Sequence, residues 1–318
     1  MCPRMQEEVC CMMSWTRSKD MVERVGLVGC GRMGLCMADV LVKGGFSVVA
    51  YDKFSEATGR AVALGATAAL SPKELASLVD VVLMSLPGPA QLEEVLFSED
   101  GVIKGLGKGR VVVDTSTVDP NTTRENARRV EETTQSAYLD CPILGRPSAV
   151  GKWMLPTGGN KDALEWAKPA LLTFAANAIS VGEHGAGNAL KLLNQMMFSC
   201  INAISSEVMA IAAHVGVDPK VFYDTVASSS AATVSGLFRE VGKCIINDDF
   251  DDPAFTVDLL IKDAKLALQM AKESDAPSVI AGTAQLYNEL AHSSGHGSED
   301  TSALYKVFAK LYKKEYRA

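Results

Sequence analysis

Three glycines with a fixed spacing occur near the start of the chain, within the sequence VGLVGCGRMG. Gly29, Gly31 and Gly34 follow a short apolar run and precede a helical pattern. In that context the first glycine allows a tight turn, the second lets the backbone approach a pyrophosphate, and the third lets the helix pack closely on the strand. The N-terminus of the helix adds free N–H groups and a positive partial charge. The spacing therefore indicates a dinucleotide-binding turn, rather than a glycine-rich turn without a ligand.

The next apolar run ends in an acid followed by a base. Asp52 lies 18 residues after Gly34, near the spacing expected for an acid that meets the adenine ribose. A carboxylate accepts a hydrogen bond from the ribose 2′-hydroxyl and repels a 2′-phosphate, which favours NAD. Lys53 could receive that phosphate instead, so NADP stays open as an alternative.

A second group of polar residues lies on an otherwise apolar helical stretch. Asn194, Gln195 and Asn202 are offset from Lys191 by 3, 4 and 11 residues, which places all four on one face of a helix. Burying such groups without partners is costly. They either form a chemical site or satisfy carbonyl groups at a seam between domains, and the spacing alone does not choose.

The elements that hold the glycine turn alternate along the first half of the chain. Apolar runs predict strands at RVGLVG, FSVVAYD, DVVLMSLP, RVVVDTST and AYLDCP, separated by helical patterns at 33–43, 55–64, 89–97 and 121–132. Continuous apolar strands that alternate with helices are typical of a doubly wound α/β fold, with a parallel sheet covered on both faces. We therefore expect a Rossmann-type dinucleotide-binding domain over residues 23–183.

No strand pattern follows residue 183. Residues 186–215 predict one long helix that joins the two halves, and Asp218-Pro219 is typical of a helix start. Further helices are expected at 235–246, 256–273, 277–291 and 300–314. We therefore predict an all-helical domain over residues 184–318, to which we assign substrate binding and oligomerisation. Its apolar surface, such as LIKDAKLALQMA, is suited to oligomerisation. Residues 1–22 fit no later pattern and are treated as an N-terminal extension.

The composition narrows the class of protein. The 318 residues carry 31 basic and 38 acidic side chains, a net charge of −7, which argues mildly against nucleic-acid binding. No window approaches eighteen uninterrupted apolar residues, so no membrane span is expected. The eight cysteines show no paired metal spacing and indicate reduced thiols in an intracellular protein. The first twenty residues lack the apolar core of a secretory signal, so a cytoplasmic location is expected, with a mitochondrial one left open.

Other reactive residues fit structural roles better. His292 and His296 lie in a turn-like run, and two lone imidazoles make a poor metal site, so no metal is expected. Asp114 ends a predicted strand and is expected to be structural. Ser85 and Ser116 have no histidine partner visible in the sequence. The acidic run before Pro253 is expected to be a solvated loop.

Five blocks in order resemble the β-hydroxyacid dehydrogenases, the group of 3-hydroxyisobutyrate dehydrogenase, tartronate semialdehyde reductase and glyoxylate reductase, with 6-phosphogluconate dehydrogenase as a larger relative. The resemblance runs from Glu23 to Phe308. The blocks are GLVGCGRMG with the LVKGG that follows, DTSTVDP, DCPILGRPSAVGK, GEHGAGNALKLLNQ and FTVDLLIKDAKLAL. Five ordered blocks are much more specific than the glycine spacing alone.

The resemblance implies a role for each matching residue. Lys191 matches the catalytic lysine of the family, and Asn194 and Gln195 match its amide positions one turn later. Thr117, in DTST, matches a residue beside the nicotinamide and the substrate. Further cofactor contacts are implied at Arg32, Met33, Leu86, Pro87, Gln91 and Lys262.

The block DCPILGRPSAVGK departs from the family pattern. Most members have Asp-Ala-Pro-Val-Ser-Gly-Gly there, and the serine and glycines hold the substrate carboxylate. Here Leu144, Gly145 and Arg146 stand at those positions, and Leu144 has no hydroxyl to donate. The guanidinium of Arg146 could take over a carboxylate or phosphate as a bidentate clamp. Alternatively, Arg146-Pro147 caps a turn, with the arginine paired to a surface acid.

The resemblance implies an NAD(P)-dependent dehydrogenase or reductase of a small anionic hydroxy acid or its semialdehyde, expected to be a homo-oligomer. Hydride passes between cofactor and substrate carbonyl, while Lys191 protonates the forming alkoxide or, in reverse, accepts the hydroxyl proton. One alternative is an imine reductase of related fold, although such relatives usually lack the lysine. Another is a non-catalytic dinucleotide-binding scaffold, which would be expected to lose Lys191 or the glycines.

Overall fold

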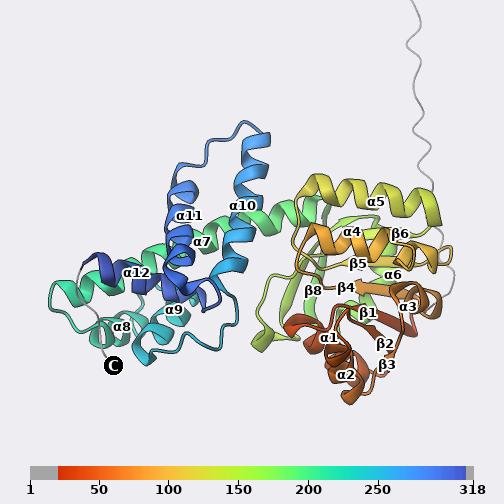
Figure 1. Ribbon diagram of the computed structural model, residues 1–318, viewed down its shortest axis with the longest axis horizontal. Helices are drawn as coiled ribbons and strands as arrows, with labels where there is room; N and C mark the ends of the chain where they lie inside the picture. The colour runs from red at the N-terminus through yellow and green to blue at the C-terminus, as the bar shows by residue number, and fades with distance from the viewer. Residues whose placement is uncertain (1–20, 313–318) are drawn as a thin grey trace, which may run out of the picture.

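The computed structural model describes residues 21–312, which form a sheet-containing part and a helical part connected by one long helix (Figure 1). Most of the N-terminal extension expected at 1–22 lies outside the described residues, as does the end of the helix expected at 300–314. The two parts correspond to the Rossmann and all-helical domains predicted from the sequence. Their limits at residues 23, 183 and 318 stay predictions.

Eight strands form a single sheet in the order β3-β2-β1-β4-β5-β6-β7-β8. The first six strands run parallel, and the alternating pattern predicted all of them except the short β3. They are β1 (Arg24–Val28), β2 (Ser47–Tyr51), β3 (Thr67–Ala68), β4 (Val81–Met84), β5 (Val111–Asp114) and β6 (Ala137–Asp140). The intervening helices are α1 (Arg32–Lys43), α2 (Ser55–Ala63), α3 (Pro72–Leu78), α4 (Pro89–Phe97) and α5 (Pro120–Thr134).

The last two strands depart from the all-parallel expectation. β7 (Trp153–Gly159) pairs antiparallel with β6, and β8 (Ala175–Gly182) pairs parallel with β7. The connection from β6 to β7 contains only a short 3₁₀ turn at Pro147–Ala149 and no crossover helix, so the chain returns in the opposite direction. A crossover helix, α6 (Lys161–Leu171), does join β7 to β8, and these two strands are parallel.

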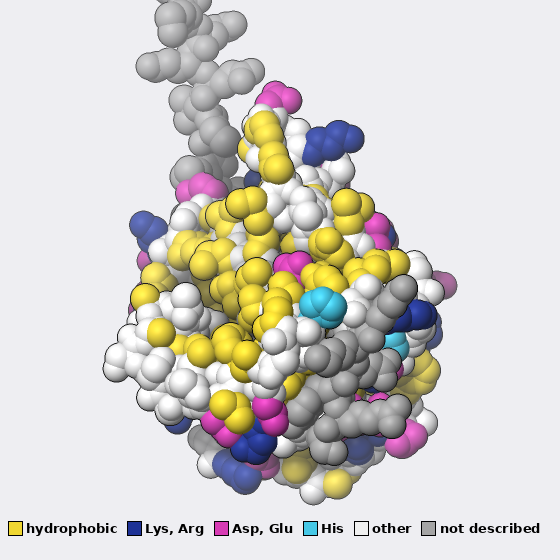
Figure 2. Space-filling model, turned by 90° about the vertical axis from the view of Figure 1, so that its left-hand side faces the viewer, with side chains coloured by type: hydrophobic (Ala, Val, Ile, Leu, Met, Phe, Trp, Pro, Cys, Tyr) yellow, Lys and Arg dark blue, Asp and Glu magenta, His cyan; other side chains and the backbone are white. Residues whose placement is uncertain are grey.

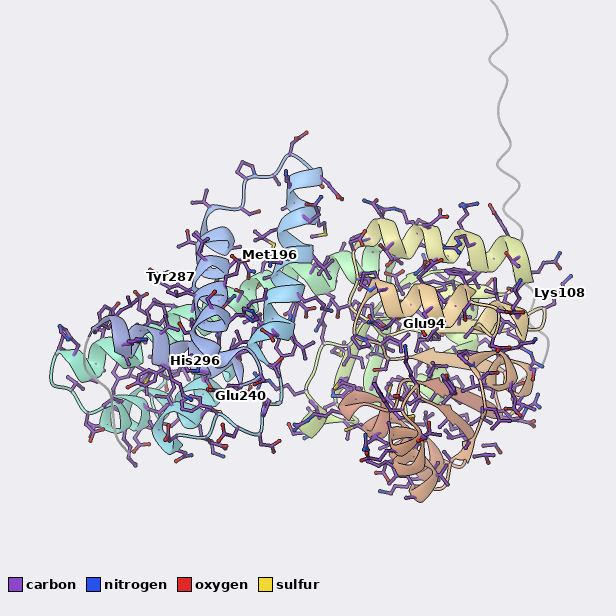
Figure 3. All side chains as sticks on the ribbon, in the orientation of Figure 1. Glu94, Lys108, Met196, Glu240, Tyr287 and His296 are labelled. Atoms are coloured by element: carbon purple, nitrogen blue, oxygen red, sulfur yellow. The ribbon has the colours of Figure 1, made fainter. Side chains whose placement is uncertain are left out.

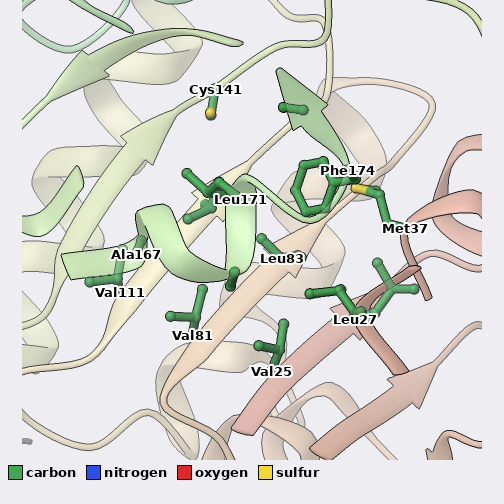
Figure 4. Packing of buried hydrophobic residues seen from close by; sticks show 14 of the residues in the cluster. Val25, Leu27, Met37, Val81, Leu83, Val111, Cys141, Ala167, Leu171 and Phe174 are labelled. Atoms are coloured by element: carbon green, nitrogen blue, oxygen red, sulfur yellow. The ribbon is translucent and has the colours of Figure 1, made fainter. Parts of the chain in front are cut away.

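Side chains that alternate along the central strands build a core on each face of the sheet. On one face, strand residues pack against α1 and α6. Figure 4 shows part of this cluster, with Val25, Leu27, Val81, Leu83 and Val111 near Met37, Ala167, Leu171 and Phe174. On the other face, Val28, Val82, Met84 and Val112 pack with residues of α3, α4 and α5. Burial on both faces explains why these strands read as continuous apolar runs.

The helical part contains α7 (Ala186–His214), α8 (Pro219–Ala227), α9 (Gly236–Asn247), α10 (Val257–Glu273), α11 (Val279–Ala291) and α12 (Leu304–Leu311). Asp218 caps α8 by accepting a hydrogen bond from Lys220 N (2.7 Å), as its sequence predicted. Helix α7 contacts β7 near its start and α9 to α12 farther along, so it belongs to the packing of both parts.

Helix α7 also bears on the expectation of no membrane span. Within residues 21–312 it is long and apolar enough to cross a membrane by length and composition, and half of its most apolar window is buried inside the protein. Core helices of soluble proteins meet the same two criteria, so this is weak evidence for a span.

Candidate active site

A cavity of about 550 Å³ lies between the two parts of the protein. Its Rossmann wall comes from the segments that follow β1, β4, β5 and β6, and its helical wall from α7, α10 and the loop before α10. The carboxyl ends of parallel strands are where ligands bind in open α/β sheets. The cavity therefore lies at the edge of the sheet where open α/β folds bind their ligands.

The glycine turn has the geometry that a dinucleotide needs. Gly29 adopts a φ of +96°, and a Cβ on it would overlap Ser85 O. A Cβ on Gly34 would overlap the carbonyl oxygen of Gly29, so the close approach of α1 to β1 requires glycine there. Gly31 lines the cavity, and a Cβ on it would meet no atom within 4 Å. This open space in front of the N-terminus of α1 fits a pyrophosphate.

Asp52 and Lys53 lie at the end of β2, outside the cavity lining. The carboxylate of Asp52 accepts hydrogen bonds from Cys30 N (2.7 Å) and Phe54 N (2.9 Å), which braces the glycine turn. Lys53 is exposed and forms an ion pair with Glu94 of α4 at 3.2 Å. Gln91 is also exposed on α4 and does not line the cavity.

Two loops of the Rossmann wall are tied together by hydrogen bonds. Leu86 N donates to Ser116 Oγ (3.0 Å), which joins the loop after β4 to the loop after β5. Lys262 of α10 reaches across the cavity, and its Nζ donates to Pro87 O (3.1 Å) and Thr117 O (3.0 Å). The lysine thus connects the helical part to both loops.

The start of α7 is held by an acid from the sheet. Asp140, at the end of β6, accepts hydrogen bonds from Gly185 N and Asn188 N, both at 2.9 Å. These bonds satisfy first-turn N–H groups that a helix leaves free. They also fix the register of α7, which places Lys191 one turn beyond Asn188 at the cavity.

Lys191 is partly buried in the cavity wall. Its Nζ donates a hydrogen bond to Ile143 O (2.9 Å). Burial lowers the pKa of the ammonium, the carboxylate of Asp263 opposes this shift, and the charge of Lys262 adds to it. A lysine of lowered pKa exchanges protons more readily near neutral pH than an exposed one.

The two amides after Lys191 differ in their surroundings. Gln195 is buried and donates to Asp263 Oδ2 (2.7 Å), whereas Asn194 is exposed to the cavity and donates to Gln195 Oε1 (3.3 Å). Asp263 also lies 2.9 Å from Lys262 Nζ, so its carboxylate links the buried amide to that lysine. Asn202 lies outside the cavity and donates to Thr301 O (2.9 Å), so it satisfies a carbonyl group within the helical part and not at a seam between the domains.

The loop that carries Arg146 is anchored by a buried tryptophan. Trp153 Nε1 donates to Arg146 O (2.7 Å), and a Cβ on Gly145 would overlap the Trp153 ring. Leu144 pairs with Met154 in an isolated bridge and does not line the cavity, whereas Gly145 and Arg146 do. The backbone of this loop is therefore fixed, and its arginine side chain is presented at the cavity.

Two arginines at the cavity form ion pairs with acids of the helical part. Arg146 lies 2.5 Å from Glu240 of α9, and its guanidinium carbon lies 5.7 Å from the centroid of the Phe198 ring. Arg32, at the start of α1, pairs with Asp252 in the loop before α10. Arg146 therefore shows features of both interpretations offered by the sequence, because it is paired to an acid and also lines the cavity.

Several residues of the lining were not anticipated from the sequence. Phe198 lies seven residues after Lys191, on the same face of α7, so helical spacing could have identified it. The rest come from loops and from α10, where no local pattern marks them. The unanticipated lining residues are Ser85, Thr115, Ser116, Ile143, Pro147, Phe198, Ala254, Phe255, Leu259 and Asp263.

The two histidines considered for metal binding each contact an acidic side chain. Among residues 21–312, no group of three or more His, Cys, Asp or Glu side chains could hold a metal ion. His292 contacts Asp258 at 2.6 Å and His296 contacts Glu299 at 3.0 Å. Asp114 is buried and accepts from Tyr138 Oη (2.8 Å), and burial raises its pKa to about 6.

Comparison with known proteins identifies the class and then the family. Residues 24–182 match the NAD binding domain of 6-phosphogluconate dehydrogenase, and residues 185–308 match the NAD-binding family of NADP-dependent 3-hydroxyisobutyrate dehydrogenase. Over 291 residues the chain is 32% identical to L-threonate dehydrogenase of Cupriavidus necator, with 91% of this chain and 97% of that protein covered. These matches define an NAD(P)-dependent oxidoreductase that acts on CH–OH groups.

The fold agrees with that class. A crystal structure of 3-hydroxyisobutyrate dehydrogenase from Salmonella typhimurium superimposes with a TM-score of 0.83 at 31% identity, covering 90% of this chain and all of that one. The chain belongs to the β-hydroxyacid dehydrogenase family. An imine reductase from a Pseudomonas species is more distant, at 19% identity and a TM-score of 0.57, and shares the fold alone.

Proposed function

We propose that this dehydrogenase interconverts a small hydroxy acid and its semialdehyde or keto form, with Lys191 as the general acid and base. The observation that carries the proposal is the position of Lys191 in the cavity wall, with its pKa lowered by burial. When bound, the nicotinamide cofactor supplies the hydride for reduction or takes it in oxidation. Lys191 as ammonium gives a proton to the forming alkoxide, and neutral Lys191 accepts the hydroxyl proton in the reverse direction.

The cofactor would lie along the Rossmann wall. Gly29, Gly31 and Gly34 leave space for the pyrophosphate at the start of α1, next to Arg32 and Met33. Leu86, Pro87 and Thr117, whose backbones are tied together through Ser116 and Lys262, would border the nicotinamide. Asp52 would face the adenine ribose, which favours NAD over NADP.

Asn194 and Arg146 would bind the substrate from two sides. Asn194 faces the cavity and would orient the reacting oxygen, whereas buried Gln195 would hold Asn194 in place. Leu144 offers no hydroxyl, so the backbone N–H of Gly145 would hold the carboxylate next to the reacting carbon, and the guanidinium of Arg146 would bind an anionic group of the substrate. Lys191 and Thr117 would also contact the substrate.

Lys191→Ala tests the proposal. General acid–base catalysis contributes roughly 10²–10⁴-fold, so turnover should fall by that factor while cofactor affinity stays nearly unchanged. Absorbance of the nicotinamide measures turnover, and fluorescence titration measures cofactor binding. Lys191→Arg keeps the charge but cannot lose its proton, so its turnover should also be low. The control is Lys265→Ala, at an exposed lysine of α10 that is paired with Glu289, and its turnover should be normal. Normal turnover of Lys191→Ala would contradict the assignment.

The same assay separates the alternatives. Semialdehydes, glyoxylate and cyclic imines are offered with NADH or NADPH. Reduction of imines alone would favour an imine reductase, and cofactor binding without turnover of any carbonyl would favour a scaffold. The retained Lys191 and glycines favour the dehydrogenase.

A homo-oligomer is supported by apolar surface on the helical part. Leu190, Met197, Ile204 and Ile211 recur every seven residues along α7 and are 36–64% exposed. Hydrophobic side chains also gather on the outer end of the helical part (Figure 2). An apolar stripe with this period is suited to packing against a second helix. The cytoplasmic location, and the absence of nucleic-acid and membrane partners, stay predictions.

A further inference from the structure

We propose that Arg146 and Glu240 form an exchangeable ion pair that selects hydroxy acids carrying a distal anionic group. The carboxylate of Glu240 pairs with the guanidinium that the distal anion of the substrate takes over when it binds. The inference rests on the proposed function and names its substrate class: an acid with a second anion several bonds from the reacting carbon.

The position of the guanidinium makes the exchange geometrically feasible. Glu240 comes from α9 of the helical part (Figure 3). Arg146 comes from the Rossmann part, and 2.5 Å separates its Nη1 from Oε2 of Glu240. Arg146 lines the cavity, whereas Glu240 does not. The guanidinium therefore stands at the border of the cavity, with the carboxylate on its outer side.

The guanidinium approaches a ring that lies beyond Lys191 along α7. Phe198, which it approaches, follows Lys191 by seven residues, or roughly 10 Å along the helix axis at 1.5 Å per residue. The Cα–Cβ bonds of both residues tilt toward the N-terminus of α7, so the bases of the two side chains keep this offset. A three-carbon hydroxy acid is too short to contact both cations. Arg146 is therefore placed for the far end of a longer substrate, and the Gly145 backbone for the nearer carboxylate.

The ion pair is weak enough to be replaced. The side chains of Arg146 and Glu240 are 27% and 47% exposed, and partly exposed pairs hold together only weakly. An arginine has five N–H donors in a planar fork and binds oxyanions through two parallel hydrogen bonds. A ligand anion inside the cavity gains from that geometry, and the Phe198 ring, whose centroid lies 5.7 Å from the guanidinium carbon, adds a cation–π attraction that helps to hold the arginine there.

The backbone under Arg146 does not need to move in the exchange. Trp153 Nε1 holds Arg146 O, and the Trp153 ring fills the space beside Gly145. Trp153 is fully buried and packs against Phe174 with 6.0 Å between ring centroids. Only side-chain torsions of Arg146 and Glu240 change when one anion replaces the other.

The test uses Arg146→Gln, Glu240→Gln and the double variant with a set of 3-hydroxy acids that differ only in a distal methyl, carboxylate, sulfonate or phosphonate group. Arg146→Gln should raise KM for the three anionic acids by about tenfold or more and leave the methyl acid nearly unchanged. Glu240→Gln removes the competitor and should lower KM for the anionic acids by roughly 2–5-fold, with kcat unchanged. In the Arg146→Gln background, Glu240→Gln should have no further effect.

Opposite results would overturn the inference. A rise in KM for Glu240→Gln would make that residue a fixed support of Arg146, and an equal effect of Arg146→Gln on all four acids would place the guanidinium at the nearer carboxylate. Arg239→Gln is the control. It removes an exposed charge next to Glu240, where Arg239 donates a hydrogen bond to Ala227 O, and it should not change KM for any of the four acids. The anionic acid with the lowest KM identifies the distal group.

A binding measurement separates this inference from the proposed function. Calorimetry on the cofactor-bound protein should detect the anionic acids with wild type and Glu240→Gln, and much more weakly with Arg146→Gln. If no acid is turned over but this pattern appears, the exchange stands and the proposed reaction fails. If turnover occurs without this pattern, the reaction stands and the exchange fails.

Discussion

The two walls of the cavity depend on different kinds of interaction. The Rossmann wall carries Arg32 and Arg146, but its shape depends on the backbone of the segments that follow the strands, as at Gly31 and in the loops tied through Ser116. The helical wall presents charged side chains, among them Lys191, Lys262 and Asp263, each held by a partner distant in sequence. The first wall depends on local backbone geometry and the second on tertiary pairing. Substitutions should therefore fail in different ways on the two walls.

The largest effect is expected on the Rossmann wall, from Gly34→Ala. Its Cβ would overlap the carbonyl oxygen of Gly29, and relief requires backbone to move, so the free energy of unfolding should fall by about 1–3 kcal/mol or more. Gly31→Ala is the matched control, because its Cβ meets no atom. It should cost about 1 kcal/mol or less as a weaker helix cap, yet reduce cofactor affinity. Denaturant unfolding measures the stability of both variants, and cofactor titration measures their affinity. Equal losses of stability in the two variants would contradict the different roles assigned to Gly31 and Gly34.

An intermediate effect is expected on the helical wall, where charges tune the pKa of Lys191. Reduction needs the ammonium form, so its rate should fall as pH rises through that pKa. Asp263 raises the pKa and Lys262 lowers it. Asp263→Asn should therefore move this fall to lower pH, and Lys262→Gln should move it to higher pH. Profiles of kcat against pH at saturating cofactor measure the shifts, and shifts of the same sign would refute this electrostatic account.

The smallest effect is expected outside the cavity, at Lys53. Its exposed ion pair with Glu94 should contribute no more than about 1 kcal/mol to stability. If Lys53 meets a 2′-phosphate, Lys53→Gln should weaken NADP binding several-fold and leave NAD binding unchanged. Glu94→Gln frees the lysine and should strengthen NADP binding. Unchanged NADP affinity in both variants would remove Lys53 from the cofactor site.

The Rossmann wall could be predicted because its signals are local. Continuous apolar strands and the glycine spacing both act within a few residues, and the structure contains these elements. Strand β3, which has only two residues, was missed, and so were β7 and β8. The sequence WMLPTGG of β7 contains proline and two glycines, which disfavour a strand, and its pairing with β6 and β8 is non-local.

The helical wall could be predicted only in part. Lys191 and its amides were found from their spacing and from a family resemblance, but spacing did not reveal that Gln195 is bonded to Asp263, 68 residues away. Nor did it show that Arg146 pairs with Glu240. A side chain on a helix can be assigned to a face by its period, whereas its partner depends on how that helix packs against others.

The cap that Asp140 provides for α7 has a consequence for recombination between relatives. The two matched family regions meet between residues 182 and 185, just before α7 begins. Lys191 falls in the second region, but Asp140 and Ile143, which hold its helix and its ammonium, fall in the first. A chimera joined at that natural boundary would take its proton carrier from one parent and the groups that place it from the other. Successful exchange of helical parts would therefore require two parents in which Asp140 and Ile143 make the same contacts with the start of α7 and with Lys191.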